Sequence, residues 1–382
     1  MSPLQEHSGS AVKFSARKIK TWLQTSAAAT VLFAIPAVGA VGAPSHANPV
    51  VASEFIYLKA PFRSCHASTL VETSSNLVAA WFGGTAERNP DVCIYVSRLE
   101  NHAWSTPMKV ADGVGFTTNR QPCWNPVLFQ PQHGPLLLFY KVGPKPSAWW
   151  GMWTTSPDNG ITWTKPERLP DSVLGPIKDK PIQLSDGVIL SGSSTENEGR
   201  HVHFELSKDN GQTWSCTPPV EGSGDLGAIQ PTLLTLANGH LEALARTDKG
   251  RIGVTFSSDE GRTWSAMKPT DLPNPDSGID AVTLADGRQL LVYNHNVRGG
   301  SLNKGRSPLN VALSRDGIHW MAALVLENNP KAPSGFSYPA VIQTRDGLVH
   351  ITYTWERRRI RHVVVDPALL NPLPMTDGKW PG

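Results

Sequence analysis

The stretch Ser156-Pro157-Asp158-Asn159-Gly160-Ile161-Thr162-Trp163 is one copy of a repeated pattern, Ser-x-Asp-x-Gly-x-Thr-Trp. Two further full copies occupy residues 207–214 and 257–264, a copy one residue shorter occupies 314–320, and a degenerate copy occupies 97–104. Successive copies begin 50 to 59 residues apart. A repeat of this period is typical of the blades of a β-propeller, so the pattern favours that fold.

The chemistry of this pattern, called the Asp-box below, indicates a structural role. We expect its Asp carboxylate to accept hydrogen bonds from backbone N–H groups of a tight turn, and its Gly to occupy a position with positive φ. The Trp that ends the box is expected to fold back and pack on its own blade. The aspartates of the boxes are therefore predicted to shape hairpins rather than to take part in catalysis.

Apolar hairpins precede the boxes and complete the repeat. Two apolar strands meet at turns such as Asn238-Gly239 and Asp286-Gly287. The chain contains six such repeats, at residues 66–104, 122–163, 178–214, 228–264, 278–320 and 337–365. The last repeat lacks a box, and its outer strand, 360–365, is expected to pair with an N-terminal strand at 55–58, which would close the ring. We predict an all-β, six-bladed β-propeller of four-stranded blades with Asp-box hairpins over residues 48–370, followed by a C-terminal tail at 371–382.

The N-terminal segment resembles a targeting sequence. Four basic residues between positions 13 and 20 precede an apolar stretch at about 22–43, and Ser45-His46-Ala47 fits a small-residue cleavage site. Residues 1–47 are therefore predicted to be a signal peptide. The alternative is an uncleaved N-terminal membrane anchor, because about 20 apolar residues can span a bilayer. Both interpretations predict a secreted or periplasmic protein.

Composition limits the partners. The net charge is +3 and no long basic run is present, which argues against nucleic-acid binding.

The four cysteines, at 65, 93, 123 and 216, contain no Cys-x-x-Cys pair, so no metal ligands are predicted. They are expected to be either disulfide-bonded or buried free thiols. No calcium-binding loop of the EF-hand type is present, no cofactor is predicted, and nothing in the sequence indicates an oligomer, so a monomer is expected.

Taken together, the Asp-boxes and six repeats resemble the sialidase (neuraminidase) superfamily over residues 50–366. That resemblance implies a site in which arginines bind the carboxylate of an acidic sugar, a Tyr acts as nucleophile with help from a Glu, and an Asp serves as acid/base. Arg246, at the end of an apolar strand, matches the second arginine of the family. Arg306 matches the third arginine, and Tyr338, in Ser-Tyr-Pro-Ala, matches the nucleophile.

Other positions depart from the family pattern. His66 occupies the place of the first arginine, and Gln230 occupies the place of the Glu. Glu87 and Asp91 are the candidates for the acid/base role, because both lie in the loop where the family has its Asp. The chain therefore resembles the sialidase-like BNR/Asp-box proteins more than the characterised sialidases, and part of that wider group resembles lyases that cut rhamnose–glucuronate linkages.

Further polar and aromatic residues near predicted strand ends suggest a basic pocket for an acidic glycan. Lys141 and Lys178 are candidate substrate-binding residues, and His295 is a candidate base because histidine titrates near neutral pH. Trp149 and Trp150 either offer a stacking platform for a sugar or pack within their blade.

Three functions fit these residues. The first is a sialidase-like exo-glycosidase in which Arg246 and Arg306 bind the carboxylate of a terminal acidic sugar and Tyr338 is the nucleophile. The second is a uronate-directed lyase, in which the same cations with Lys178 neutralise the carboxylate, His66 or His295 removes a proton and Tyr338 donates one. The third is a glycan-binding propeller without catalytic activity.

Overall fold

The computed structural model describes residues 47–115, 119–197, 199–299 and 303–381. The predicted signal peptide or anchor lies outside these residues except for its last position. The described chain is almost entirely β-structure, apart from three single 3-10 turns, η1 (Pro146–Ala148), η2 (Pro367–Leu369) and η3 (Thr376–Gly378). Within the described residues, no helix is both long and apolar enough to cross a membrane.

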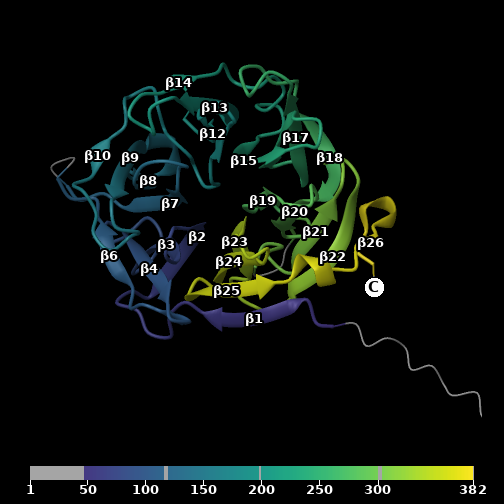
Figure 1. Ribbon diagram of the computed structural model, residues 1–382, viewed down its shortest axis with the longest axis horizontal. Helices are drawn as coiled ribbons and strands as arrows, with labels where there is room; N and C mark the ends of the chain where they lie inside the picture. The colour runs from purple at the N-terminus through teal and green to yellow at the C-terminus, as the bar shows by residue number, and fades with distance from the viewer. Residues whose placement is uncertain (1–46, 116–118, 198, 300–302, 382) are drawn as a thin grey trace, which may run out of the picture. The chain divides into compact units, whose positions relative to one another are not determined.

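Six antiparallel sheets surround a common centre as the blades of a six-bladed β-propeller (Figure 1), which confirms the predicted fold. Blade 1 contains β2 (Ser64–Glu72), β3 (Leu77–Gly84), β4 (Cys93–Glu100) and β5 (Ala103–Trp104), with β6 (Met108–Ala111) also paired to β4. Blade 2 contains β7 (Cys123–Phe129), β8 (Leu136–Val142), β9 (Trp150–Ser156) and β10 (Glu167–Arg168). Blade 3 contains β11 (Ile182–Gln183), β12 (Ile189–Thr195), β13 (His201–Ser207) and β14 (Ser215–Cys216).

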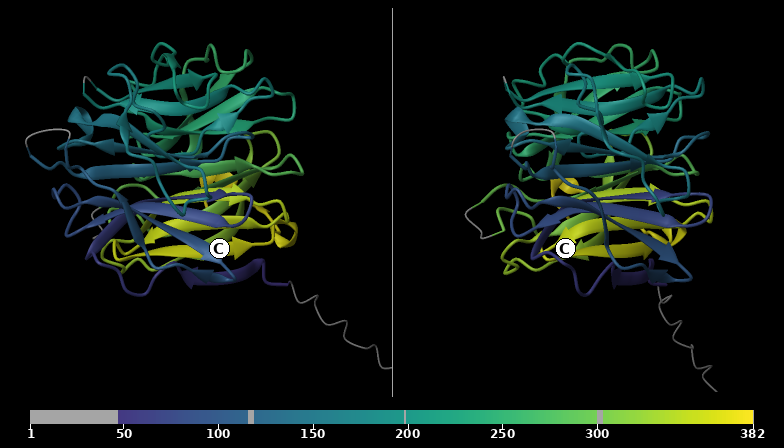
Figure 2. Two further views of the ribbon diagram at one scale, coloured as in Figure 1. Left: turned by 60° about the vertical axis from the view of Figure 1, so that its left-hand side comes forward. Right: turned by 90° about the vertical axis from the view of Figure 1, so that its left-hand side faces the viewer.

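The remaining blades follow the same order from the centre outward. Blade 4 contains β15 (Ile229–Thr235), β16 (Leu241–Arg246), β17 (Arg251–Ser257) and β18 (Lys268–Pro273). Blade 5 contains β19 (Asp280–Thr283), β20 (Gln289–Tyr293), β21 (Leu309–Ser314), β22 (Trp320–Glu327) and β26 (Leu373–Pro374). Blade 6 contains β23 (Phe336–Gln343), β24 (Val349–Trp355), β25 (Arg359–Val365) and β1 (Val50–Phe55). The turned views show loops gathered at the two ends of the strands (Figure 2).

The two ends of the chain complete the last two blades. The N-terminal strand β1 pairs with β25, from Val50 opposite Val365 to Phe55 opposite Arg361, so the ring closes as expected. The strand lies at 50–55 and not at the predicted 55–58, since beyond Phe55 the chain leaves the pairing and the buried Tyr57 stacks on Trp81. The C-terminal tail adds β26 to the edge of blade 5.

The Asp-boxes have the predicted turn chemistry. The Asp158 carboxylate accepts hydrogen bonds from the Thr162 backbone N–H at 2.8 Å and from its hydroxyl at 2.6 Å, and Gly160 has a φ of 88°. The hydrogen bonds from the Thr162 side chain and backbone lower the pKa of Asp158 to about 2.

The Trp residues of the boxes correct one expectation. Trp264 of blade 4 stacks on Phe204 of blade 3 with ring centroids 3.7 Å apart, and Trp214 of blade 3 meets Phe139 of blade 2 edge-on. These rings pack on the preceding blade and not on their own. Their indole N–H groups donate to the carbonyls of Gly261 and Gly211, which directs each ring across the boundary between blades. Each of these boxes therefore also helps to hold neighbouring blades together.

Candidate functional site

Four of the inner strands share an irregularity at the same end. The register of β2, β7, β15 and β23 shifts near the start of each strand. A non-glycine residue at each shift has a positive φ: Ala67, Asn125, Gln230 and Tyr338, with values of 54°, 33°, 57° and 55°. Such β-bulges re-aim side chains, and they often occur at functional sites. Two of the four positions are the predicted site residues Gln230 and Tyr338.

Tyr338 lies at the centre of a group of cations from three blades. Its hydroxyl accepts a hydrogen bond of 2.6 Å from Nη1 of Arg246. The guanidinium carbons of Arg246 and Arg306 both lie 5.6 Å from the centre of the Tyr338 ring, and the Lys178 ammonium lies 5.9 Å away. The structure thus brings together four residues predicted from blades 3, 4, 5 and 6.

Arg246 is held in place by neighbours on its own blade. Its Nε donates to Oδ1 of Asp276 at 2.9 Å, and its Nη1 donates to Oε1 of Gln230 at 3.3 Å. Burial would lower the pKa of Arg246, but Tyr338 and Asp276 outweigh that effect and raise it. Asp276 also pairs with Arg200 at 3.1 Å, so one carboxylate faces two guanidinium groups. Arg246 is therefore both a hydrogen-bond donor to Tyr338 and a source of positive charge at the site.

Arg306 differs from Arg246 because it is largely buried without an acidic partner. Among the described residues, no carboxylate lies within ion-pair distance of its guanidinium, although Arg246 and Lys178 each have one. Burial, reinforced by the charges of Arg357 and Arg246, lowers the pKa of Arg306 to about 10, so it stays charged at neutral pH. A buried, unpaired guanidinium favours binding of an anion from outside the chain.

Arg357 is a fourth cation that the sequence did not single out. It lies in the turn between β24 and β25, where it and Glu356 have positive φ. Its Nη1 pairs with Oε2 of Glu87 at 2.5 Å. Its charge contributes to the lowered pKa of both Arg306 and His66, which places it close to the cluster. Arg357 of blade 6 therefore adds a guanidinium close to His66, the residue that stands in place of the first arginine of the family pattern.

His66 packs directly against Tyr338, with ring centroids 4.0 Å apart. Its Nδ1 is 2.9 Å from Oγ1 of Thr354, and its buried Nε2 has no hydrogen-bond partner within the described chain. Burial, followed by the nearby arginine charges, holds the pKa of His66 well below its usual value. The imidazole is therefore neutral at physiological pH.

Lys178 crosses the centre of the propeller instead of facing solvent. Its ammonium donates to the carbonyl of Ile279 at 2.6 Å, to that of Pro339 at 2.7 Å and to Oδ1 of Asp179 at 2.5 Å. All three of its donors are therefore used within the protein. Lys178 supports the bulge that carries Tyr338, whereas the sequence predicted a substrate ligand.

Two candidates for the acid/base role have different surroundings. Asp91 accepts hydrogen bonds from the backbone N–H of Thr85 at 2.8 Å and from its hydroxyl at 2.9 Å, so it stabilises its own loop. Glu87, in the same loop, reaches Arg357 at the edge of the cluster. The geometry therefore favours Glu87 over Asp91.

Four other candidates make their contacts away from Tyr338. Lys141 is buried and donates to the Pro176 carbonyl at 2.7 Å. His295 Nδ1 lies 2.6 Å from the Tyr293 hydroxyl, and its ring meets that of Trp380 from the C-terminal tail. The two tryptophans make blade contacts: Trp149 meets Trp124 edge-on, and Trp150 has a guanidinium over its ring. The packing interpretation of Trp149 and Trp150 is the one that these contacts support.

A family model described as BNR repeat-like domain matches residues 75–351, well over half of the chain. The chain belongs to the BNR repeat-like domain family. No curated protein was found to match it.

Solved structures share the fold of this BNR protein at low sequence identity. NanB sialidase from Streptococcus pneumoniae has a TM-score of 0.65 at 14% identity, over 85% of this chain and 71% of its own. Trypanosoma rangeli sialidase has a TM-score of 0.63 at 16% identity, over 80% of this chain and 55% of its own. A Dyadobacter fermentans protein of unknown function has a TM-score of 0.66 at 16% identity, over 82% of this chain and 98% of its own.

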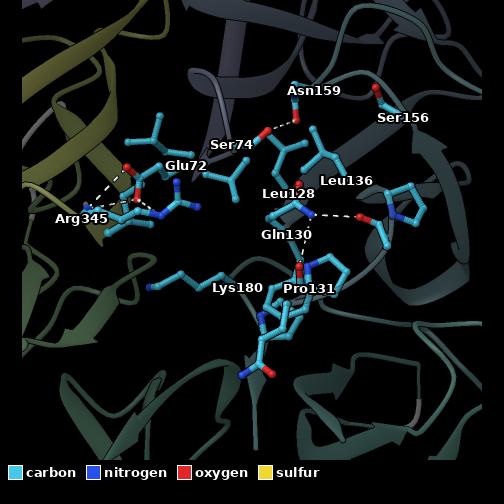
Figure 3. Close-up of a pocket in the computed structure, with 18 of the residues that line it drawn as sticks. Glu72, Ser74, Leu128, Gln130, Pro131, Leu136, Ser156, Asn159, Lys180 and Arg345 are labelled. Carbon is cyan, nitrogen blue, oxygen red and sulfur yellow. Dashed lines mark hydrogen bonds and ion pairs between the residues drawn. The ribbon is translucent and has the colours of Figure 1, made fainter. Parts of the chain in front are cut away.

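The BNR protein has a cavity of about 620 Å³ at the opposite end of its inner strands (Figure 3). The cavity is lined by strand ends and hairpin turns of blades 1, 2, 3 and 6. There Glu72 accepts a hydrogen bond from the backbone N–H of Arg345 at 3.1 Å, and the Lys180 ammonium lies 3.0 Å from Asp280. Charges at this end are paired within the protein, so the cavity offers little to attract an acidic ligand.

The four cysteines, all in the described part of the chain, are free thiols. Cys65, Cys93 and Cys123 are buried, whereas Cys216 is exposed. Of the two alternatives that the sequence left open, the structure has the free thiols.

Proposed function

We propose that this protein is an exo-glycosidase that acts on a glycan ending in an acidic sugar. The observation that carries the proposal is Arg306, a partly buried guanidinium without a carboxylate partner among the described residues, beside Tyr338. A sugar carboxylate bound there would supply the missing negative charge. Arg246 and Arg357 would add to the positive potential around that carboxylate.

In this proposal Tyr338 is the nucleophile. A neutral phenol adds no second anion to a site that receives an acidic sugar, and tyrosine takes this role in sialidases. Attack by its oxygen forms a bond to the anomeric carbon while the glycosidic bond breaks, and the leaving oxygen takes a proton from water beside the Glu87 carboxylate, which is paired with Arg357. A second water then breaks the bond between Tyr338 and the sugar, which releases the sugar and restores the phenol. Since Gln230 cannot accept the phenol proton, that proton passes to water. The hydrogen bond from Arg246 stabilises the charge that develops on the phenol oxygen.

A second candidate, elimination by a uronate lyase, is favoured by two observations. Gln230 stands where a carboxylate base would be needed for hydrolysis. His66 is neutral, packs against Tyr338, and has a buried Nε2 without a hydrogen-bond partner in the described chain, so this nitrogen could take a proton from a substrate that reaches it. In that reaction His66 would remove the C5 proton of a uronate, and Tyr338 would protonate the leaving oxygen.

One assay separates these reactions. The protein is incubated with sialosides and with glucuronate-ended glycans, and both reducing sugar and ultraviolet absorbance of an unsaturated uronate are recorded. The proposal predicts reducing sugar without a rise in absorbance. A rise in absorbance would establish elimination, and no signal with either substrate class would leave glycan binding as the function.

The proposed substrate fits a protein that works outside the cytoplasm, as its N-terminal segment predicts. We infer secretion or export to a periplasm. N-terminal sequencing of the protein recovered from the culture medium or periplasm tests this inference. A mature N-terminus near Asn48 is expected, and an intact segment in the membrane fraction would indicate an anchor.

A further inference from the structure

A cluster of metal-ligand types lies on blade 3, apart from the residues around Tyr338. His203 and Glu205 are two positions apart on β13, so their side chains share one face of the strand. Cys216 on β14 is the register partner of Glu205. One ligand atom from each of the three residues lies within 4.8 Å of the other two.

The ligand atoms are also held in position. Glu205 is completely buried, and its two carboxylate oxygens accept hydrogen bonds from the backbone N–H groups of Leu174 at 2.9 Å and Gly175 at 2.7 Å. His203 Nε2 and Oε1 of Glu205 form a hydrogen bond of 3.1 Å, and a bound ion would replace this bond, since two ligands of one tetrahedral ion can be this far apart. Backbone hydrogen bonds to a ligating carboxylate fix its orientation and are typical of metal sites.

The chemistry of the three groups points to zinc. Nitrogen, oxygen and thiolate sulfur are the zinc ligands found in proteins, and a soft thiolate disfavours calcium and magnesium. A carboxylate and a thiolate together balance the two positive charges of the ion. Cys216 is exposed, which gives an ion access from solvent and leaves room for water as a fourth ligand.

We propose that His203, Glu205 and Cys216 form a zinc-binding site on blade 3. The site does not depend on a Cys-x-x-Cys spacing, because antiparallel pairing of β13 with β14 brings residues 205 and 216 together. A bound ion would tie the two-residue strand β14 to its neighbour β13. The proposal does not rest on the function proposed for Tyr338.

Cobalt is the probe for this site, because thiolate ligation to Co²⁺ gives a charge-transfer absorption band. The full protein is treated with a chelator, freed of it and titrated with Co²⁺. We expect one equivalent to bind with that band, Zn²⁺ to displace it, and Zn²⁺ to raise the melting temperature. Absence of the band, or cobalt bound only weakly and without saturation, would overturn the proposal.

Variants assign the ligands. Cys216→Ser changes an exposed side chain and should fold, and it is expected to lose the charge-transfer band and the thermal stabilisation by zinc. His203→Asn should lose most of the cobalt binding. His319→Asn is the matched control, because His319 forms another histidine–carboxylate pair, with Asp316 at 2.6 Å, and it should bind as the unaltered protein does. A band that persists in Cys216→Ser would refute the assignment.

Discussion

The two ends of the propeller are built from the same strands but differ in how their charged side chains are paired. At the Asp-box end, each carboxylate is satisfied within its own turn, as Asp158 is by Thr162. At the Tyr338 end, charged side chains from several blades converge, and Arg306 has no acidic partner among the described residues. The difference teaches that the repeats build the scaffold, whereas the site arises where the repeats differ from one another.

Residues with positive φ occur at both ends but in different settings. At the Asp-box end they lie in the turns of the boxes, where a non-glycine residue and a glycine follow one another, as in Glu260 and Gly261. At the other end, bulges in the inner strands place Gln230 and Tyr338 in that conformation. A non-glycine residue there costs of order 1 kcal/mol, and such strain persists where the surrounding structure or function requires it.

The largest effect is expected from Tyr338→Phe. Loss of the nucleophilic oxygen should lower kcat/KM for an acidic glycoside by at least about 10³-fold. Stability should fall by only about 1–2 kcal/mol, the worth of the hydrogen bond from Arg246. Kinetics paired with urea unfolding check this prediction, and retained turnover would remove Tyr338 from the chemistry.

At the Tyr338 end, the variant Arg306→Met is expected to affect stability and activity in different ways. Because Arg306 is a partly buried cation without a carboxylate partner in the described chain, its replacement by an apolar side chain should leave the melting temperature unchanged or raise it. The same variant should lower kcat/KM by about 10²-fold or more, since a charged hydrogen bond to the substrate is lost.

A methyl ester of the substrate is the control for Arg306→Met. The ester lacks the carboxylate charge, so the variant and the unaltered protein should differ little on it. An equal loss with acid and ester would mean that Arg306 does not bind the carboxylate.

At the Asp-box end, Asp259→Ala should act in the opposite way. The Asp259 carboxylate accepts hydrogen bonds from the backbone N–H of Thr263 at 2.9 Å and its hydroxyl at 2.6 Å. Their loss should cost about 1–2 kcal/mol of unfolding free energy. Activity per folded molecule should not change, and a fall in kcat/KM at full folding would contradict the division between the two ends.

Acid should weaken the Asp-boxes. Hydrogen bonds, the Thr263 side chain first, lower the pKa of Asp259 to about 2, against about 4 in an unfolded chain. A carboxyl with a lowered folded pKa stabilises the protein above the unfolded value, and this stabilisation is lost as pH falls from about 4 to about 2. Urea unfolding across that range should show a shallower pH dependence for Asp259→Asn. Identical slopes would exclude this contribution.

The smallest effect is expected from Arg345→Ala in the turn beside the cavity. Its guanidinium lies 3.9 Å from Glu72 and is largely exposed to water. Exposed pairs of this kind contribute little, so the melting temperature and kcat/KM should both remain near their original values, within about 0.5 kcal/mol for stability. A strong loss of turnover would mean that the cavity takes part in function.

The fold was predictable because hairpin turns mark all six blades, and the Asp-boxes recur at intervals of 50 to 59 residues in the blades before the last. Arg246, Arg306 and Tyr338 were found from strand ends and the family resemblance, and the structure brings them together. The box Trp residues were assigned to the wrong blade because sequence shows which residue is apolar but not which neighbour it reaches.

The rest of the site depends on geometry that sequence patterns do not encode. Arg357 was missed because it lies in a turn, in the charged run 356–359, and reaches the site only through its positive φ. Lys141 and His295 were included because they follow or end apolar strands. A shift of one residue in a strand moves a side chain to the other face, and pattern alone did not decide between the faces.

The most direct test of the proposed function is to trap the covalent intermediate. The protein is incubated with a glycosyl fluoride of an acidic sugar that carries a second fluorine beside the anomeric carbon, and its peptides are analysed by mass spectrometry. The account predicts one added sugar on the peptide that contains Tyr338 and none in Tyr338→Phe. Turnover of acidic glycosides without any adduct on Tyr338, or with an adduct on another residue, would contradict it.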